Sequence, residues 1–239
     1  MELRDSLVIT LGDDRLAAEV RGVVRRFPVE GDLVTALDHV DLEIRFGEMT
    51  VVAGPSGSGK STLLSLLACT QRPDEGSVKI GDTEVLMLSR RDRRELRRDR
   101  LGIVLPQPSE NLLDHLDAAA NVRWATQQRL GKPAADTHND LDAILEAVGL
   151  AAARSRRVRE LSGGEQQRLA VACALAGDPE LIILDEPTAS LDRASATILV
   201  EVLAGVAARG ATMVIATHDP LVIDAGQAIA ELDHGRRVR

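Results

Sequence analysis

Residues 54–61 read GPSGSGKS, which fits the pattern G-x-x-x-x-G-K-[ST]. The mostly apolar residues 49–53 predict a short buried strand before this stretch, and residues 61–68 predict a helix after it. Free backbone N–H groups and the helix dipole favour an anion at such a helix start, and glycines let the backbone wrap closely around it. The stretch therefore predicts a phosphate-binding loop. The expected contacts come from Gly54, Pro55, Ser56, Gly57, Ser58, Gly59, Lys60, Ser61 and Thr62.

Two side chains of this loop suit a nucleotide with bound Mg²⁺. Lys60 is expected to reach the β- and γ-phosphates, and Ser61 to place its hydroxyl on the metal ion. The alternative is a glycine-rich turn without a ligand, and the strand and helix on either side argue against it.

A second strand is expected to end in two acidic residues. The apolar run at residues 181–184 is too short for a helix and predicts a buried parallel strand that delivers Asp185 and Glu186 at its carboxyl end. Ligands of open α/β sheets bind at that edge. Asp185 is therefore the expected Mg²⁺ ligand, and Glu186 the general base for an attacking water. The alternative is a solvated acidic turn.

The strand predicted at residues 212–217 ends in the same way, with His218 and Asp219 after it. His218 would then lie at the same edge, within reach of the γ-phosphate and Glu186. A single histidine is more often structural, but its position beside two other strand ends favours a catalytic role.

Residues 161–168 read LSGGEQQR, and the S-x-x-E spacing predicts a capping box at the start of a helix over residues 163–176. Ser162 is the expected cap. Gly163 and Gly164 each cost about 1 kcal/mol of helix stability, so we expect something to approach the backbone there closely. A single nucleotide already has its site at Lys60, so this second phosphate-ready helix start must serve another purpose.

Taken in order along the chain, these motifs resemble the ATP-binding subunits of ABC transporters, and the resemblance covers residues 18–235. The implied fold is an α/β phosphate-loop NTPase cassette with a mostly parallel core sheet and an N-terminal antiparallel β region. A helical subdomain is expected over about residues 108–161, where Leu141, Ile144, Leu145 and Val148 are spaced as one helix face. We expect a single domain over residues 1–239, with residues 1–17 as an N-terminal extension.

The resemblance implies a head-to-tail pair of such domains around two ATP molecules. In that arrangement Ser162, Gly163 and Gly164 of one copy close on the γ-phosphate held by the other copy's loop. Asp192, in the Ser-Leu-Asp stretch at residues 190–192, would lie at the seam, and His218 would contact the γ-phosphate. Hydrolysis at Glu186 would release the pair.

Two further residues are assigned by the resemblance alone. Phe27 stands where the family usually has an aromatic residue that stacks on adenine, although a core position at the end of the first strand is the alternative. The family's Mg²⁺- and nucleotide-sensing glutamine corresponds either to Gln107 or to Pro106, depending on how the stretch LPQPSE at residues 105–110 is aligned. Prolines at 106 and 108 push the residues before them toward extended conformations, so this loop should be stiff.

Composition excludes several classes of protein. The net charge of −8 argues against a general nucleic-acid binder. No apolar stretch is long enough to span a membrane, and the N-terminus lacks a secretion signal. Cys69 and Cys173 fall in predicted helices and suggest a reducing compartment without disulfides or zinc. The expected location is cytoplasmic, peripheral on the inner face of the cell membrane.

Softer motifs, such as RPDEG at residues 72–76, favour the branch of the family that powers lipoprotein release, macrolide export and a related cell-division complex. Residues 90–100 hold seven arginines and three acidic residues. Their simplest interpretation is a solvated helix with i,i+4 ion pairs, and the sharper one is contact with anionic lipids or a membrane partner.

Two functional classes remain. The first is an ATP-hydrolysing subunit that forms a homodimer and drives separately encoded integral membrane subunits in transport or mechanotransmission. The second is a soluble ABC-type ATPase acting on a nucleic acid, a ribosome or a protein partner. A simple phosphate-loop kinase would leave LSGGE and Asp192 unexplained.

Overall fold

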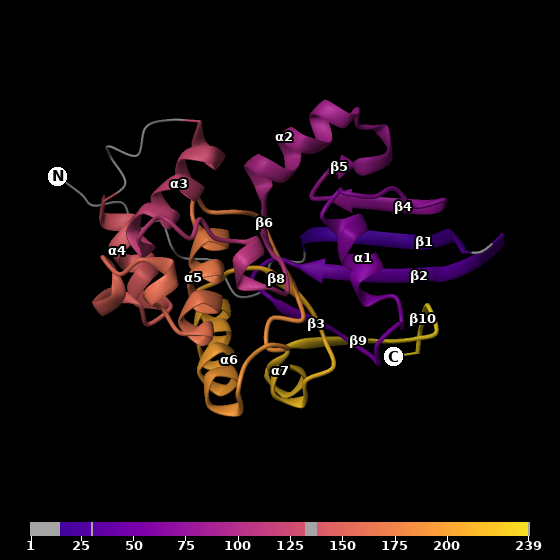
Figure 1. The fold of residues 1–239 in the computed structure, drawn as a ribbon. Coiled ribbons are helices and arrows are strands. Elements are labelled where there is room, and N and C mark those ends of the chain that lie inside the picture. Colours follow the sequence, from indigo (N-terminus) through magenta and orange to yellow (C-terminus); the bar gives the residue numbers. More distant parts are fainter. Residues whose placement is uncertain (1–14, 30, 132–137, 239) are drawn as a thin grey trace.

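The computed structural model describes residues 15–29, 31–131 and 138–238, and it contains two sheets in different layers (Figure 1). The six-stranded core sheet has the order β10-β9-β3-β8-β7-β6, and every neighbouring pair except β10 with β9 is parallel. Its strands are β3 (Met49–Ala53), β6 (Leu101–Val104), β7 (Leu181–Asp185), β8 (Met213–Thr217), β9 (Ala228–Asp233) and β10 (Arg236–Arg237). The prediction of a mostly parallel core sheet is confirmed.

The second sheet is antiparallel and has the order β2-β1-β4-β5. Its strands are β1 (Leu16–Val29), β2 (Asp32–Arg45), β4 (Glu75–Ile80) and β5 (Thr83–Glu84). Because β1 begins at Leu16, the last two residues of the predicted 1–17 extension belong to this sheet. Residues 1–14 of that extension lie outside the described residues.

The helices are α1 (Lys60–Leu67), α2 (Arg90–Arg100), α3 (Ala118–Leu130), α4 (His138–Ala147), α5 (Gly163–Leu175), α6 (Arg193–Ala208) and α7 (Pro220–Ala225). Short 3-10 turns lie at Val85–Met87, Pro108–Glu110, Ala151–Ala153 and Val158–Glu160. Figure 1 shows α3, α4 and α5 gathered on one side of the molecule, with the antiparallel sheet on the other. Leu141, Leu145 and Val148 are buried and Ile144 packs beside them, as their spacing predicts.

Two hydrophobic clusters sandwich the core sheet. One joins β7 and β8 to the helices α3 to α6, and the other joins the opposite face of the sheet to α1 and the antiparallel layer. All five residues of β3 and of β8 are buried, because both faces of these central strands are covered. This burial explains why both strands are apolar apart from Thr50 and Thr217.

Cys69 does not lie in a helix, contrary to the expectation from sequence. The helix α1 ends at Leu67, and Cys69 has a left-handed backbone with φ 54°. Such a backbone costs a non-glycine residue about 1 kcal/mol or more, so the burial of Cys69 must hold it in place. Cys173 does lie in α5, and both thiols are free. Burial raises the pKa of Cys69 to about 11 and that of Cys173 to about 12, so both thiols stay protonated.

Within the described ranges, none of the helices combines the length and apolar character needed to cross a lipid bilayer.

Candidate nucleotide-binding site

Three strand ends meet at one edge of the core sheet and build the candidate site. Strand β8 lies between β3 and β7, and the pairing of Ala53 with Thr217 and of Asp185 with Ala216 brings their carboxyl ends level. The phosphate loop follows β3, Glu186 follows β7, and His218 follows β8. The predicted convergence of these three segments is therefore present.

The phosphate loop needs its glycines because of close packing. A Cβ atom on Gly54 would lie 2.2 Å from the Leu232 carbonyl oxygen, and one on Gly59 would lie 2.4 Å from that of Ala36. Both glycines also have positive φ, 152° and 103° respectively. The loop is thus held against β9 and β2 in a conformation that other residues adopt only with strain.

The start of α1 suits an anion. Its N-cap is Gly59, and no side chain accepts a hydrogen bond from its first turn. By contrast, side chains cap α2, α3, α5, α6 and α7, through Ser89, Asp117, Ser162, Asp192 and Asp219. The free N–H groups of α1 therefore match the oxygens of a phosphate group.

Lys60 is the buried cation of this site, with only 5% of its side chain exposed. Its ammonium group donates to the carbonyl oxygens of Gly54 at 2.8 Å and Pro55 at 3.0 Å. It also lies 3.4 Å from Glu186 Oε1. The Lys60 ammonium thus lies between the loop backbone and the end of β7, where it can exchange these oxygens for those of a phosphate.

Ser61 and Asp185 form the expected pair for a metal ion. The Ser61 hydroxyl donates to Asp185 Oδ1 at 3.1 Å. Burial raises the pKa of Asp185, and the charge of Glu186 raises it further, while the Ser61 hydrogen bond and the charge of Lys60 lower it. These two oxygens, together with phosphate oxygens and water, fit the all-oxygen coordination that Mg²⁺ prefers.

Glu186 stands in a constrained position between two nitrogen-bearing side chains. Its φ of 44° is unusual for a non-glycine residue, and its N–H donates to the Ala216 carbonyl oxygen at 2.9 Å. His218 Nδ1 lies 3.0 Å from each Glu186 carboxylate oxygen. The geometry can hold Glu186 beside a nucleophilic water, with the exposed His218 next to it.

The capping box of LSGGEQQR is present as predicted. Ser162 Oγ accepts from the Glu165 N–H at 3.3 Å, and the Ser162 N–H donates to Glu165 Oε2 at 2.7 Å. The hydrogen bonds from the backbone and hydroxyl of Ser162 and the charge of Arg156 lower the pKa of Glu165. The helix runs over Gly163–Leu175, one residue shorter than expected.

The two glycines of this helix start have different surroundings. A Cβ atom on Gly164 would lie 2.9 Å from the Cβ and Oγ of Ser195, whereas one on Gly163 would meet nothing within 4 Å. Packing against Ser195 therefore explains why residue 164 is a glycine. The expectation that something outside the chain approaches the backbone closely now applies to Gly163 alone. Gly163 and Ser162 are exposed.

Ser195 links two of the predicted motifs, and sequence reasoning missed it. Its N–H and hydroxyl donate to the two carboxylate oxygens of Asp192, at 2.9 and 2.8 Å. These hydrogen bonds lower the pKa of Asp192, which caps α6. The starts of α5 and α6 are thus locked together through Gly164, Ser195 and Asp192. The D-x-x-S spacing of Asp192 and Ser195 is the signal that could have shown it.

The start of α5 does not belong to the phosphate-loop edge of the same chain. In Figure 1, α5 lies apart from α1, with β6 and β8 between them in this view. Ser162 and Gly163, at the start of α5, are therefore exposed to solvent away from the phosphate loop of the same chain.

Phe27 and Gln107 lie at the periphery. The Phe27 ring is half-buried, outside both core clusters, and the Arg25 guanidinium lies over it at 4.6 Å from its centre. The alternative of a core position is therefore wrong, and adenine stacking stays a prediction. Gln107 is exposed and Pro106 half-buried, and no hydrogen bond joins the Gln107 side chain to another described residue. Its alignment with the family's glutamine stays open.

Asn111 holds the loop that contains Gln107, and sequence reasoning missed this role. Its amide accepts from the Leu105 N–H at 2.8 Å and donates to the carbonyl oxygens of Leu105 and Gln107, both at 2.9 Å. An asparagine just after a proline-rich turn is the signal that could have shown it.

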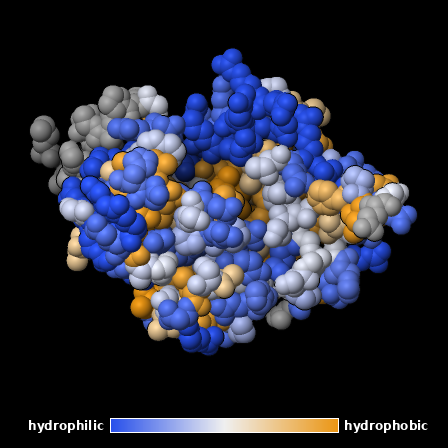
Figure 2. All heavy atoms as spheres, viewed as in Figure 1, coloured by the Kyte–Doolittle hydropathy of each residue, from blue (hydrophilic) through white to orange (hydrophobic). Residues whose placement is uncertain are grey.

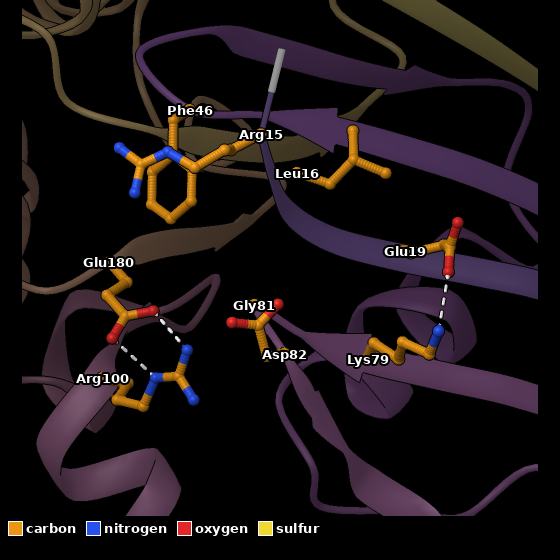
Figure 3. Close-up of a pocket in the computed structure, with 9 residues that line it drawn as sticks. All are labelled: Arg15, Leu16, Glu19, Phe46, Lys79, Gly81, Asp82, Arg100 and Glu180. Carbon is orange, nitrogen blue, oxygen red and sulfur yellow. Dashed lines mark hydrogen bonds and ion pairs between the residues drawn. The ribbon is translucent and has the colours of Figure 1, made fainter. Parts of the chain in front are cut away.

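A separate hollow of about 520 Å³ lies at the other edge of the sheet (Figure 3). Phe46, before β3, and Glu180, before β7, line it, and Glu180 pairs with Arg100 at 2.5 Å. Glu19 pairs with Lys79 across its far side. Because it lies at the amino ends of the strands, this hollow is distinct from the candidate site.

This fold and this site define a phosphate-loop nucleotide-binding domain of the α/β class. A family model described as ABC transporter matches residues 37–189, and the chain belongs to that family. It is an ATP-binding and ATP-hydrolysing domain of the transporter type.

Curated relatives and solved structures agree with this assignment. The chain is 38% identical, over 92% of its length, to the macrolide export ATP-binding/permease protein MacB of Burkholderia cenocepacia, of which it covers 32%. It is 37% identical to the MacB of Agrobacterium fabrum, over 90% of this chain and 33% of that one. The chain thus spans about a third of the length of the curated relatives it matches.

Among solved structures, a dimeric post-hydrolysis state of the ATP-binding cassette MJ0796, bound to ADP and Pi, is 32% identical with a TM-score of 0.79. The alignment covers 93% of this chain and 97% of that one. The cassette cbiO1 of Clostridium perfringens, described as part of the ABC transporter complex cbiONQ, is 26% identical with a TM-score of 0.83. It aligns over 95% of this chain and 88% of that one.

Proposed function

We propose that this chain is the ATPase engine of a membrane transporter or mechanotransmission complex and works as a head-to-tail homodimer around two Mg²⁺–ATP. Integral membrane subunits carry the substrate in this proposal, and the chain sits on the cytoplasmic face of the membrane. The observation that carries it is the exposed helix start at Ser162 and Gly163, which has open space around it and lies apart from the phosphate loop of the same chain.

Each site residue has a role in this cycle. The loop from Gly54 to Thr62 holds the phosphates, with Lys60 on the β- and γ-phosphates. Ser61 and Asp185 hold Mg²⁺, and Gln107 is the proposed sensor of the metal and its water. Glu186 accepts a proton from the attacking water, and His218 holds the γ-phosphate and the Glu186 carboxylate in place.

Asp192 supports the interface indirectly. Its carboxylate accepts two hydrogen bonds from Ser195, and Ser195 lies against Gly164. Asp192, at the proposed dimer seam, is therefore connected to the helix start at Ser162. Phe27 is the proposed adenine platform, with the Arg25 guanidinium over one face of its ring.

Membrane partners are supported by the relatives, whose names join an ATP-binding part to a permease. The cbiO1 structure is likewise described as part of a transporter complex. The rival proposal, an ATPase that acts on a nucleic acid, a ribosome or a soluble protein, is less favoured by the net charge of −8.

The first test uses Glu186→Gln, which removes the proton acceptor and keeps the size of the side chain. Hydrolysis should fall by roughly a hundredfold or more, and ATP should hold the protein as a dimer in size-exclusion chromatography with light scattering. A variant that stays monomeric with saturating ATP and Mg²⁺ would contradict the head-to-tail arrangement.

The second test separates the cap of Ser162 from its role toward the partner. Ser162→Asp keeps a side-chain acceptor for the Glu165 N–H but adds a negative charge where the partner's γ-phosphate would lie. In the Glu186→Gln background it should abolish the ATP-dependent dimer without lowering the melting temperature. Ser89→Asp, at the equivalent cap of α2, is the matched control and should leave the dimer intact.

A further inference from the structure

The arginine-rich helix α2 has two kinds of arginine, and the ion pairs separate them. Arg91 pairs with Glu95 at 2.9 Å, Arg98 with Asp99 at 2.6 Å, and Arg100 with Glu180. The remaining four arginines form no ion pair with a carboxylate anywhere in the described ranges. They are Arg90, Arg93, Arg94 and Arg97.

These four residues follow the spacing i, i+3, i+4, i+7, so they share one face of the helix, which we call the arginine face. They line a cavity of about 380 Å³ together with Cys69 and Thr70, at the turn that ends α1. Figure 2 shows the α2 region as a strongly hydrophilic projection in the same view as Figure 1. The simple interpretation, a solvated helix with i,i+4 ion pairs, holds for Arg91 with Glu95 but not for the arginine face.

Of the four guanidinium groups of the arginine face, one has a hydrogen-bond acceptor within the described part of the chain. Arg97 donates to the Cys69 carbonyl oxygen at 2.8 Å, in the turn that follows α1. No comparable acceptor serves Arg93, whose Nε is buried and has no hydrogen-bond partner among the described residues. Burial, and then the positive charges of Arg72, Arg97 and Arg90, lower the pKa of Arg93. The arginine face thus keeps positive charges close together at a cost in free energy, without an internal counter-ion.

A compact, multiply charged oxyanion would relieve this repulsion. A guanidinium group binds oxyanions through two parallel N–H donors, and several converging guanidinium groups suit a phosphate better than a single carboxylate. The cavity is separate from the nucleotide site, because Cys69 follows the carboxyl end of α1 while Lys60 and Ser61 lie at its amino end.

We propose that the arginine face is a second anion site that binds a phosphate group, either of a membrane lipid headgroup or free in solution. Arg90 and Arg94 are the exposed arms that reach the phosphate first, and Arg93 and Arg97 lie deeper against α1.

The test compares two double variants of α2 that remove equal charge, one from its unpaired arginines and one from its paired arginines. The first variant, Arg90→Gln with Arg94→Gln, removes the two exposed charges of the arginine face. The control variant, Arg91→Gln with Arg98→Gln, removes two arginines that already pair with carboxylates. None of these residues belongs to the nucleotide site, so basal ATPase activity and the melting temperature serve as checks on folding.

One arm measures co-sedimentation with vesicles of phosphatidylglycerol in phosphatidylcholine, against phosphatidylcholine alone. The other arm measures pyrophosphate binding by calorimetry. Removal of Arg90 and Arg94 should weaken vesicle binding roughly 30-fold, whereas the Arg91 and Arg98 control variant should lose much less affinity for the vesicles.

A loss of binding by the first variant alone supports the proposal in either arm. If vesicle binding is lost, the phosphate is that of a lipid headgroup, and if pyrophosphate binding is lost, it is a phosphate free in solution. Equal loss by both variants would show non-specific attraction and overturn it. Failure of the unmodified protein to bind both probes would also overturn it.

Discussion

Lys60 Nζ lies 3.4 Å from Glu186 Oε1, so the cation of the phosphate loop and the proposed general base neutralise each other before a nucleotide arrives. Both side chains are largely buried, Lys60 at 5% and Glu186 at 18% exposed. Insertion of a γ-phosphate between them would give Lys60 a new anionic partner and free Glu186 to accept a proton. Nucleotide binding thus prepares the proposed base.

Lys60→Ala should weaken ATP binding. Hydrogen bonds to charged groups contribute about 1.5–3 kcal/mol each, so we expect a loss of about 10- to 100-fold in affinity. The measurement is a titration with a fluorescent ATP analogue. Lys79→Ala is the control, because Lys79 pairs with Glu19 on the antiparallel sheet, away from the loop. Equal affinities of the two variants would remove Lys60 from the phosphate site.

Asp185→Asn should stabilise the nucleotide-free protein at neutral pH. Burial raises the pKa of Asp185 in the folded state, so its ionised form lowers the free energy of unfolding above that pKa. This penalty disappears as the pH falls through the folded pKa toward the ordinary aspartate value of about 4. Melting curves should therefore show a gain for the variant at pH 7 that shrinks toward pH 4.5.

The same variant, Asp185→Asn, should lose the stabilisation that Mg²⁺ adds to bound ATP, because asparagine is a weaker ligand for a hard cation.

Asp192→Asn should have the opposite effect on stability at pH 7, since the Ser195 hydrogen bonds lower the pKa of Asp192 and its charge stabilises the fold at that pH. That second variant should melt earlier than the parent, with the difference lost only at acidic pH. A melting temperature of Asp185→Asn at or below the parent at pH 7 would contradict the burial argument.

Sequence alone predicted the parts of the site that depend on local order. The phosphate-loop motif lies between a strand and a helix that are its direct neighbours in the chain. The strand that ends at Asp185 and Glu186 and the capping box of Ser162 are local in the same sense. In each case, neighbouring residues in the chain fix both the element and the direction of its polar end.

Contacts between distant segments could not be read in this way. The approach of Gly164 to Ser195 depends on how α5 packs on α6, and the Lys60–Glu186 distance depends on the order of strands in the sheet. The left-handed turn at Cys69 was also missed, because nothing in the side chain of cysteine favours a positive φ. Tertiary packing decides all three.

Asn111→Ala should loosen the loop that contains Gln107. The substitution removes three hydrogen bonds to the backbone of Leu105 and Gln107, each contributing about 0.5–1.5 kcal/mol, with the lower value expected in this exposed loop. Amide hydrogen exchange should rise over residues 105–110, while ATP binding by the isolated chain persists. If the loop transmits the nucleotide state, stimulation by a co-expressed membrane partner should fall. Ser109→Ala, in the same loop, is the control.

Gly163→Ala and Gly164→Ala should separate the interface from the packing of α5. An alanine at 164 would meet Ser195 at 2.9 Å, so this variant should melt earlier even without nucleotide. An alanine at 163 has open space around it and gains up to about 1 kcal/mol of helix propensity, so its monomer should melt no earlier than the parent. If the start of α5 closes on a partner's phosphate, however, the added methyl group should block ATP-dependent dimerisation in the Glu186→Gln background. Light scattering with and without ATP measures this effect. A Gly163→Ala protein that dimerises as well as its parent would show that the exposed glycine is not at the interface.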